Sequence, residues 1–280
     1  MIKIGQFNFL QISQKSERGT LLSAGQLGSV FLSKKETPNN CNVGDKLQVF
    51  IYQNARDEIV ATTRKPKIEL GGVACLKVIS TSNVGAFMDW GLPKDLFVPF
   101  GQQAKPMKSG QSHLVYMYED NTGRLCASSK LNRMLDEKGK GVKEKDKVNL
   151  LVGDKTELGY KVVVNQKFWG LLHHSDVFRE LQYGQALSGV VKKIRNDGKV
   201  DIALQAGKED SEDKLATKIL KQIASDGGFS PYHDKSPPER IYQVFGVSKK
   251  AFKAALGTLY KQKKITIEEN GIRLTEDTKS

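Results

Sequence analysis

The sequence is poor in cysteine, and its three cysteines are not arranged for a metal or a disulfide framework. Cys41, Cys75 and Cys126 lie far apart in the 280 residues and form no C-x-x-C pair. Disulfide scaffolds and zinc knuckles use closely spaced cysteines or an even set of them. We therefore expect buried, reduced thiols in a reducing compartment and no metal site.

Long hydrophobic runs are also lacking. No stretch of the sequence approaches the roughly 18 apolar residues of a membrane-spanning helix. The first residues, Met1–Gln6, contain no apolar core of a signal peptide. We expect a cytoplasmic protein with no membrane partner.

Motifs of known enzyme classes are missing as well. The sequence contains no P-loop, G-x-G-x-x-G, H-E-x-x-H or G-x-S-x-G motif and no cluster of carboxylates for a two-metal site. Of the four histidines, His173 and His174 are adjacent, but neighbouring residues of a strand point to opposite faces and so do not share a metal. We expect no enzymatic activity and no cofactor.

Positive charge is abundant. Forty-four Lys and Arg residues against 31 Asp and Glu residues leave a net charge of +13. Such an excess favours a polyanionic partner, either nucleic acid or an anionic membrane surface, although a basic protein without such a partner remains the alternative. The excess is spread along the chain, which favours several contact surfaces over one basic tail.

The strongest pattern is a repeat of about 60–70 residues that occurs three times. Each copy contains five short strand-like runs separated by glycine and polar turns, which is typical of a small β-barrel. The predicted domains are 1–66, 67–132 and 146–206, with a charged connector before the third. The strands expected in the third copy are Val148–Lys155, Gly159–Asn165, Gly170–His173, Ala186–Ile194 and Lys199–Leu204.

After the third copy the periodicity becomes helical. Residues 211–277 are predicted to contain three helices and a terminal hairpin, the layout of a winged helix-turn-helix. The run Ser236-Pro-Pro-Glu239 predicts a capping box for a helix over Pro237–Phe245, and Ser248 is expected to cap the next helix. Asn270-Gly271 lies between alternating apolar residues and predicts a hairpin turn.

The second repeat carries the most informative motifs. In order, these are Gly85-Ala-Phe-Met88, Leu96-Phe-Val98, Gly110-Gln111, Asp120-Asn-Thr-Gly-Arg124 and Ser128-Ser-Lys130. They resemble the S1 family of RNA-binding OB-folds, whose pattern is G-A-F-V, G-L-V-H, D-x-x-G-R and S-x-K. The resemblance implies that the second and third strands bind single-stranded RNA. Phe87 then takes the position of a base-stacking aromatic, and Asp120 and Arg124 that of a polar pair beside it.

Two positions of the second repeat depart from the family pattern. Val84 replaces an aromatic residue and Pro99 replaces a histidine, which weakens the predicted stacking platform. Phe87 could also be a core residue, but strand alternation places it on the same face as Asp89, and an acidic side chain indicates a solvated face.

The third repeat matches the S1 pattern at Gly170-Leu-Leu-His173, so the resemblance gives His173 the role of the RNA-contacting histidine. Arg195-Asn-Asp-Gly-Lys199 replaces D-x-x-G-R, and Phe168-Trp169 are expected in the preceding loop. The candidate RNA-binding residues are Phe87, Asp120, Arg124 and Lys130 in the second repeat and Tyr160, Lys161, His173, Arg195 and Lys199 in the third. The first repeat keeps the strand layout but lacks the aromatic and D-x-x-G-R sites, so a structural or docking barrel is an equal interpretation there.

The last predicted helix carries Lys249, Lys250 and Lys253 near its start, but few residues that could read bases. We expect these lysines to contact nucleic acid without sequence specificity, or a protein; a solvated lysine face is the alternative.

Over nearly its whole length the chain resembles the bacterial conserved virulence factor B (YitL-like) family. The resemblance is carried by the runs G-D-K-L-Q-V-F-I-Y, D-L-F-V-P and D-G-K-V-D-I-A-L. It implies a mainly β fold of three tandem S1-like OB barrels and a C-terminal winged helix. It also implies RNA binding and post-transcriptional regulation. The alternative is a scaffold or DNA-binding protein whose winged helix docks the ribosome, RNA polymerase or duplex DNA.

Overall fold

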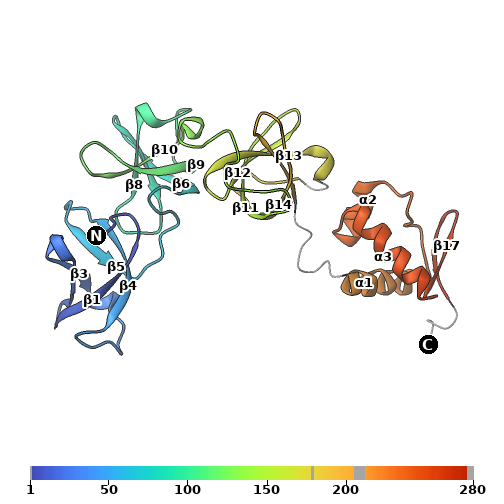
Figure 1. Cartoon of the computed structure of the whole chain (residues 1–280), viewed down its shortest axis with the longest axis horizontal. Coiled ribbons are helices and arrows are strands. Elements are labelled where there is room, and N and C mark those ends of the chain that lie inside the picture. The colour runs from blue at the N-terminus through green and yellow to red at the C-terminus, as the bar shows by residue number, and fades with distance from the viewer. Residues whose placement is uncertain (1, 178–179, 205–211, 276–280) are drawn as a thin grey trace.

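The computed structural model describes residues 2–177, 180–204 and 212–275. The predicted domain limits at residues 1, 206, 211 and 277 lie outside these ranges. Three closed β-barrels follow one another along the chain, and a helical unit with a small sheet lies beyond the third (Figure 1). The predicted fold class, mainly β with three barrels and a terminal winged helix, is confirmed.

Each barrel has five strands. The first comprises β1 (Phe7–Ser16), β2 (Gly19–Ser23), β3 (Ser29–Ser33), β4 (Lys46–Gln53) and β5 (Ile59–Thr62). The second comprises β6 (Val73–Thr81), β7 (Gly85–Asp89), β8 (Leu96–Pro99), β9 (Ser112–Glu119) and β10 (Leu125–Ser128). The third comprises β11 (Lys147–Lys155), β12 (Gly159–Val164), β13 (Phe168–His173), β14 (Ala186–Ile194) and β15 (Val200–Leu204).

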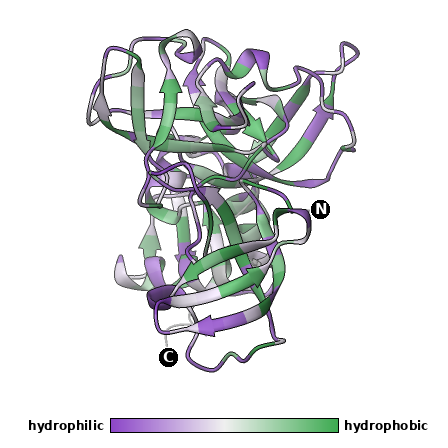
Figure 2. Ribbon diagram, turned by 90° about the vertical axis from the view of Figure 1, so that its left-hand side faces the viewer, coloured by the Kyte–Doolittle hydropathy of each residue, from purple (hydrophilic) through white to green (hydrophobic). Residues whose placement is uncertain are grey.

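The three barrels share one topology. The first strand pairs antiparallel with the second and the fourth, and a parallel pair between the third and fifth strands closes the barrel. Along the strands, apolar residues alternate with polar ones, so each barrel has its own hydrophobic interior and a more hydrophilic outside (Figure 2). Closure leaves no long unpaired strand edge.

One glycine recurs at the same register in all three barrels, at the start of the second strand. Gly19, Gly85 and Gly159 pair with the last residue of the third strand. A Cβ atom at these positions would lie 2.3, 2.3 and 2.1 Å from a carbonyl oxygen of that strand. The two strands therefore approach too closely for any other residue, which explains the glycine that opens the S1-like motif.

The first two barrels share an aromatic interface. Trp90, which follows β7, contacts Phe50 and Tyr52 of β4 edge to face, with ring centroids 5.9 and 6.0 Å apart. All three side chains are buried in one cluster. The ammonium group of Lys94 lies 2.8 Å from the Asp57 carboxylate across the same junction. Apolar burial dominates this interface, because the ion pair is exposed and contributes at most about 1 kcal/mol.

The second and third barrels meet through a smaller apolar cluster. Leu114 of β9 and Val163 of β12 are buried in it, together with Leu135 of the connector. The Tyr183 hydroxyl accepts a hydrogen bond from the Leu114 amide at 3.1 Å. The connector predicted only as a charged segment thus packs between the barrels and contributes to their junction.

The C-terminal unit is a winged helix. Its helices are α1 (Glu212–Ser225), α2 (Pro238–Phe245) and α3 (Lys249–Lys261), and its sheet contains β16 (Phe229–Ser230), β17 (Ile265–Glu268) and β18 (Gly271–Leu274). Ser248 caps α3 as predicted, since its hydroxyl accepts from the Ala251 amide at 3.2 Å. The predicted capping box is wrong: Ser236 Oγ accepts from the His233 amide instead, and α2 starts after Pro237 with no side-chain cap.

Candidate nucleic-acid interface

The outward faces of the second and third strands can be compared directly, because the strand registers coincide. The central facing pair is Leu21–Phe31 in the first barrel, Phe87–Phe97 in the second and Lys161–Leu171 in the third. This face therefore changes from apolar, through aromatic, to basic along the chain.

In the second barrel, Phe87 lies on the outward face, as one of the two interpretations had it. Its neighbours Ala86 and Met88 are fully buried, whereas Phe87 is half-buried. It lies beside Phe97 of β8, with ring centroids 5.2 Å apart and planes tilted by 37°. Phe97 was not among the RNA-binding residues predicted from the sequence, although the alternation of β8 places it opposite Phe87. The two neighbouring rings form an aromatic surface on which an unstacked base could lie.

Asp120 and Arg124 belong to the turn between β9 and β10. The Asp120 carboxylate accepts hydrogen bonds from the Thr122 and Arg124 amides at 2.8 and 3.0 Å and from the Thr122 hydroxyl at 2.7 Å. These bonds, that of the Thr122 hydroxyl first, hold the pKa of Asp120 below its ordinary value. Asp120 thus stabilises the turn, while Arg124 is exposed, 3.7 Å from Asp57 of the first barrel. Lys130 follows β10 and lines a groove toward the third barrel.

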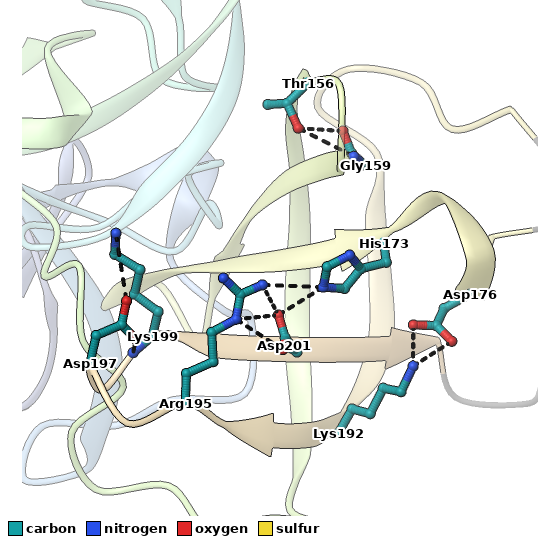
Figure 3. Close-up of polar contacts among 9 residues, drawn as sticks. All are labelled: Thr156, Gly159, His173, Asp176, Lys192, Arg195, Asp197, Lys199 and Asp201. Atoms are coloured by element: carbon teal, nitrogen blue, oxygen red, sulfur yellow. Dashed lines mark hydrogen bonds and ion pairs between the residues drawn. The ribbon is translucent and has the colours of Figure 1, made fainter.

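In the third barrel, two of the predicted RNA-binding residues are held together by a third residue that was not predicted from the sequence. His173 ends β13, Arg195 follows β14, and Asp201 lies between them on β15 (Figure 3). The Asp201 carboxylate is 2.9 Å from His173 Nε2 and accepts two bonds from Arg195 Nε, both at 3.0 Å. The Arg195 guanidinium also lies 3.2 Å from His173 Nε2. Asp201 therefore holds both predicted RNA contacts in fixed positions.

The register explains why only the third barrel has this network. The position of Asp201 is occupied by Val60 in the first barrel and by Cys126 in the second. Neither side chain can hold a guanidinium group. The His173–Asp201–Arg195 arrangement is thus a property of the third barrel alone.

The charge of Asp201 should contribute to stability in a pH-dependent way. Burial by itself would raise the pKa of Asp201. The hydrogen bonds from Arg195 and His173, together with the positive charges of these residues, have the larger effect, so the pKa lies below its ordinary value. A lowered pKa stabilises the fold above the unfolded-state pKa of about 4. This contribution is lost as the pH falls through the lower folded-state pKa.

We therefore expect Asp201→Asn to be less stable than wild type at neutral pH and the difference to shrink below about pH 4. Urea denaturation at a series of pH values measures it. Asp197→Asn, at an exposed position of the neighbouring loop, is the matched control. A difference that stayed constant down to pH 2 would show that the carboxylate charge is not involved.

Trp169 is the half-buried aromatic residue on this face of the third barrel, whereas Tyr160 points into the barrel. The sequence placed Trp169 in a loop, but Asn165 and Gln166, with φ of 48° and 61°, form a tight turn that lets β13 begin at Phe168. Tyr160 is only 5% exposed and its hydroxyl accepts from the Leu181 amide, so the structure contradicts the predicted place of Tyr160 beside the aromatic site. The ammonium of Lys161 lies 4.1 Å from the centre of the Trp169 ring.

A cavity of about 260 Å³ lies on this face of the third barrel. Lys161, Trp169, Arg195 and Lys199 are among its lining residues, and Glu137 is its one carboxylate. The predicted cations thus surround a hollow beside an indole ring. This combination suits a flat group that is attached to a negatively charged chain.

The first barrel retains one aromatic residue at the central pair of this face. Phe31 of β3 is 39% exposed and occupies the position of Phe97. The position of Phe87 itself is occupied by Leu21, so the aromatic residue expected to be missing there is absent. The turn between the last two strands is equivalent in the two barrels, with Asn54 at the position of Arg195 and Glu58 at the position of Lys199. This face of the first barrel therefore lacks the cations of the third barrel.

The lysines at the start of α3 are accessible. Lys250 and Lys253 are exposed and Lys249 is half-buried. Lys253 lies 3.9 Å from Asp234, at the limit of an ion pair. The helix sequence contains no Asn, Gln or Arg between its ends, so the cations are placed for contact with a polyanion but not for base reading.

Other kinds of site receive no support in the described part of the chain. Within residues 2–177, 180–204 and 212–275, no group of three metal-binding side chains occurs. Burial raises the pKa of Cys126 to about 11, which leaves a weakly nucleophilic thiol at neutral pH. Among the same residues, no helix has the length and apolar character needed to cross a membrane.

Comparison with known proteins gives two family matches. Residues 217–274 match the CvfB-like winged helix domain, and residues 4–64 match the S1 domain. The S1 match falls on the first barrel, which the motifs had suggested to be the most divergent. Both are nucleic-acid-binding types of domain and not enzyme families.

Relatives are similar along nearly the whole chain. The YitL protein of Bacillus subtilis is 29% identical over 276 residues, covering 95% of this chain and 92% of its own. Conserved virulence factor B of Staphylococcus epidermidis is 27% identical over 283 residues, covering 98% and 95%. A Streptococcus pneumoniae structure described as a multidomain protein with nucleic acid binding domains is 24% identical, with 97% and 98% coverage and a TM-score of 0.45. By its relatives and its two domain matches, this chain is similar to the conserved virulence factor B family over nearly its whole length.

Proposed function

We propose that the protein binds single-stranded RNA through the outward faces of its second and third barrels and acts as a non-catalytic, cytoplasmic post-transcriptional regulator. The winged helix extends this surface through the lysines of α3. The observation that carries the proposal is the face of the third barrel, where Trp169 and Lys161 lie beside the His173–Asp201–Arg195 network and a cavity.

Single-stranded RNA fits this face for two physical reasons. An exposed aromatic ring binds an unstacked base with about 1–3 kcal/mol, and only a single strand offers unstacked bases. Lys161, Arg195 and Lys199 add positive charge around the cavity, and cations gain affinity for a phosphate chain by releasing its counterions. The Phe87–Phe97 surface offers a second stacking position.

One feature favours a second function, in which the winged helix docks a ribosomal or transcription partner or duplex DNA. The lysines of α3 are accessible, but its sequence has no residue suited to read bases. Contact with a structured polyanion or an acidic protein would use such a helix without sequence specificity.

The deciding measurement is the fluorescence anisotropy of labelled poly(U) and of duplex DNA of equal length. We expect wild type to prefer the single strand and the double variant Phe87→Ala/His173→Ala to lose most of that affinity. Phe9→Ala is the control, because Phe9 is 70% exposed on β1, away from both faces. Equal or stronger duplex binding that the double variant leaves unchanged would assign the activity to the winged helix.

A further inference from the structure

A groove of about 850 Å³ separates the second barrel from the third. One wall is formed by the loop before β9 and by the segment after β10, including the short helix η4 (Leu131–Arg133). The other wall is formed by β11, β12 and Tyr183. Of the residues that define the candidate interface, Lys130, Lys161 and Trp169 also line this groove.

The charge of the groove is strongly one-sided. Its lining includes Lys105, Lys130, Arg133 and Lys161, against Asp154 as the one carboxylate. The remaining polar lining consists of groups that can bond to phosphate or ribose oxygens: Gln111, Ser112, His113, Ser129, Asn132 and Tyr183. Lys105 and Arg133 are exposed, and their side chains are assigned to no ion pair in the described ranges. Four cations along one groove concentrate an anionic chain there.

The groove is continuous with the cavity on the third barrel. Lys161 and Trp169 line both hollows. The Lys161 ammonium donates to Asn132 Oδ1 at 2.8 Å, which connects the third barrel to η4. The indole Nε1 of Trp169 is one of two buried side-chain nitrogen or oxygen atoms without a hydrogen-bond partner in the described parts of the chain. The indole N–H of a residue that lines both hollows therefore lacks an acceptor among the described residues.

We propose that the groove binds the phosphodiester backbone of the same RNA strand whose base stacks on the third barrel. The two hollows then form one binding track that passes Trp169, and the junction between the barrels becomes part of the site. This inference rests on the proposed function, and it adds a binding segment that lies between the barrels and not on either S1 face.

Lys161 connects the two parts of this track. It covers one face of the Trp169 ring and donates a hydrogen bond to Asn132. A base can stack on that face only when the ammonium moves away, and the phosphates in the groove offer it a new partner. Stacking and backbone binding are thereby coupled through one side chain.

The test compares two lengths of oligouridine in a titration with full-length protein. An oligomer of about 4 nucleotides covers only one barrel face, whereas one of about 12 spans the face and the groove. The variant is Lys105→Ala/Arg133→Ala, which removes two cations from the second-barrel wall of the groove and changes no residue of the third barrel's face. The control is Lys34→Ala/Lys35→Ala, which removes the same charge from exposed positions of the first barrel.

We expect the variant to lose about tenfold in affinity for the long oligomer and to bind the short one as wild type does. The slope of log affinity against log salt for the long oligomer should become shallower by about 1.4, since each phosphate contact on a single strand contributes about 0.7. If the variant and the control bind both lengths with equal affinity, the proposal that the groove binds the RNA backbone is wrong, and the RNA-binding proposal remains intact. An equal loss at both lengths also overturns the groove proposal, because the groove would then not be a separate segment. If wild type binds neither oligomer, the proposed function itself fails.

Discussion

Replacing Trp169 by leucine is expected to weaken the binding of single-stranded RNA by about five- to a hundredfold, as measured by anisotropy with oligouridine. The range corresponds to the loss of about 1–3 kcal/mol for one stacked base. Leucine keeps apolar contacts with the cluster around Val163, against which Trp169 packs, but it removes the flat ring. The loss should therefore come from stacking and not from the junction between the barrels.

The companion variant Trp169→Phe separates these two roles. It restores a flat ring and should recover a large part of the affinity, with a melting temperature close to that of Trp169→Leu. Phe9→Ala again serves as a control for an exposed aromatic residue away from the interface. If leucine and phenylalanine bound RNA equally, stacking on this position would be excluded, and the cations around the cavity would have to account for the affinity.

Replacing Trp90 by alanine should lower the free energy of unfolding by about 3–5 kcal/mol, the usual cost of removing a buried tryptophan. Trp90 is 2% exposed and packs against Phe50 and Tyr52 of the first barrel. Its indole nitrogen also donates to the Lys94 carbonyl. The cavity left behind would open the interface between two barrels, each of which depends on the other to cover apolar surface.

Chemical denaturation followed by circular dichroism measures this loss. Phe100→Ala is the matched control, because Phe100 belongs to the same barrel but is 53% exposed, and it should change stability by less than about 0.5 kcal/mol. The Trp90 variant should still bind a short oligouridine under conditions where it is folded, since the third barrel does not contact this interface. A stability loss under 1 kcal/mol would mean that the two barrels are held together by other contacts.

The candidate site could be predicted from the sequence where strand alternation and turn motifs decide the outcome. Phe87 is on the outward face because Ala86 and Met88 are inside, and that follows from a period of two. His173 and Arg195 were named from their motifs, and the structure brings them within 3.2 Å of each other. Asp201, which holds them together, lies in a run that reads as an ordinary amphipathic strand.

The errors of the sequence analysis also have a physical cause. Tyr160 and Lys161 are adjacent, so one of them must point inward, and the tyrosine does. Trp169 was placed in a loop because nothing local shows that Asn165 and Gln166 form a turn with positive φ. That turn depends on pairing between β12 and β13, which extends the sheet by two residues and places Trp169 on the same face as Lys161.

The sequence by itself determined the number of barrels, the winged helix and the resemblance to the conserved virulence factor B family, because these follow from repeats, periodicity and motifs that are local in the chain. Only the tertiary structure decided which side chains meet: Trp90 with the first barrel, Asp201 with His173 and Arg195, and Lys161 with both Trp169 and Asn132. Some of these contacts join residues that are distant in sequence, such as Trp90 with Phe50 and His173 with Asp201, and the others join neighbouring strands. Their proximity depends on strand register and on how one barrel packs against the next, neither of which is set by the pattern of any single segment.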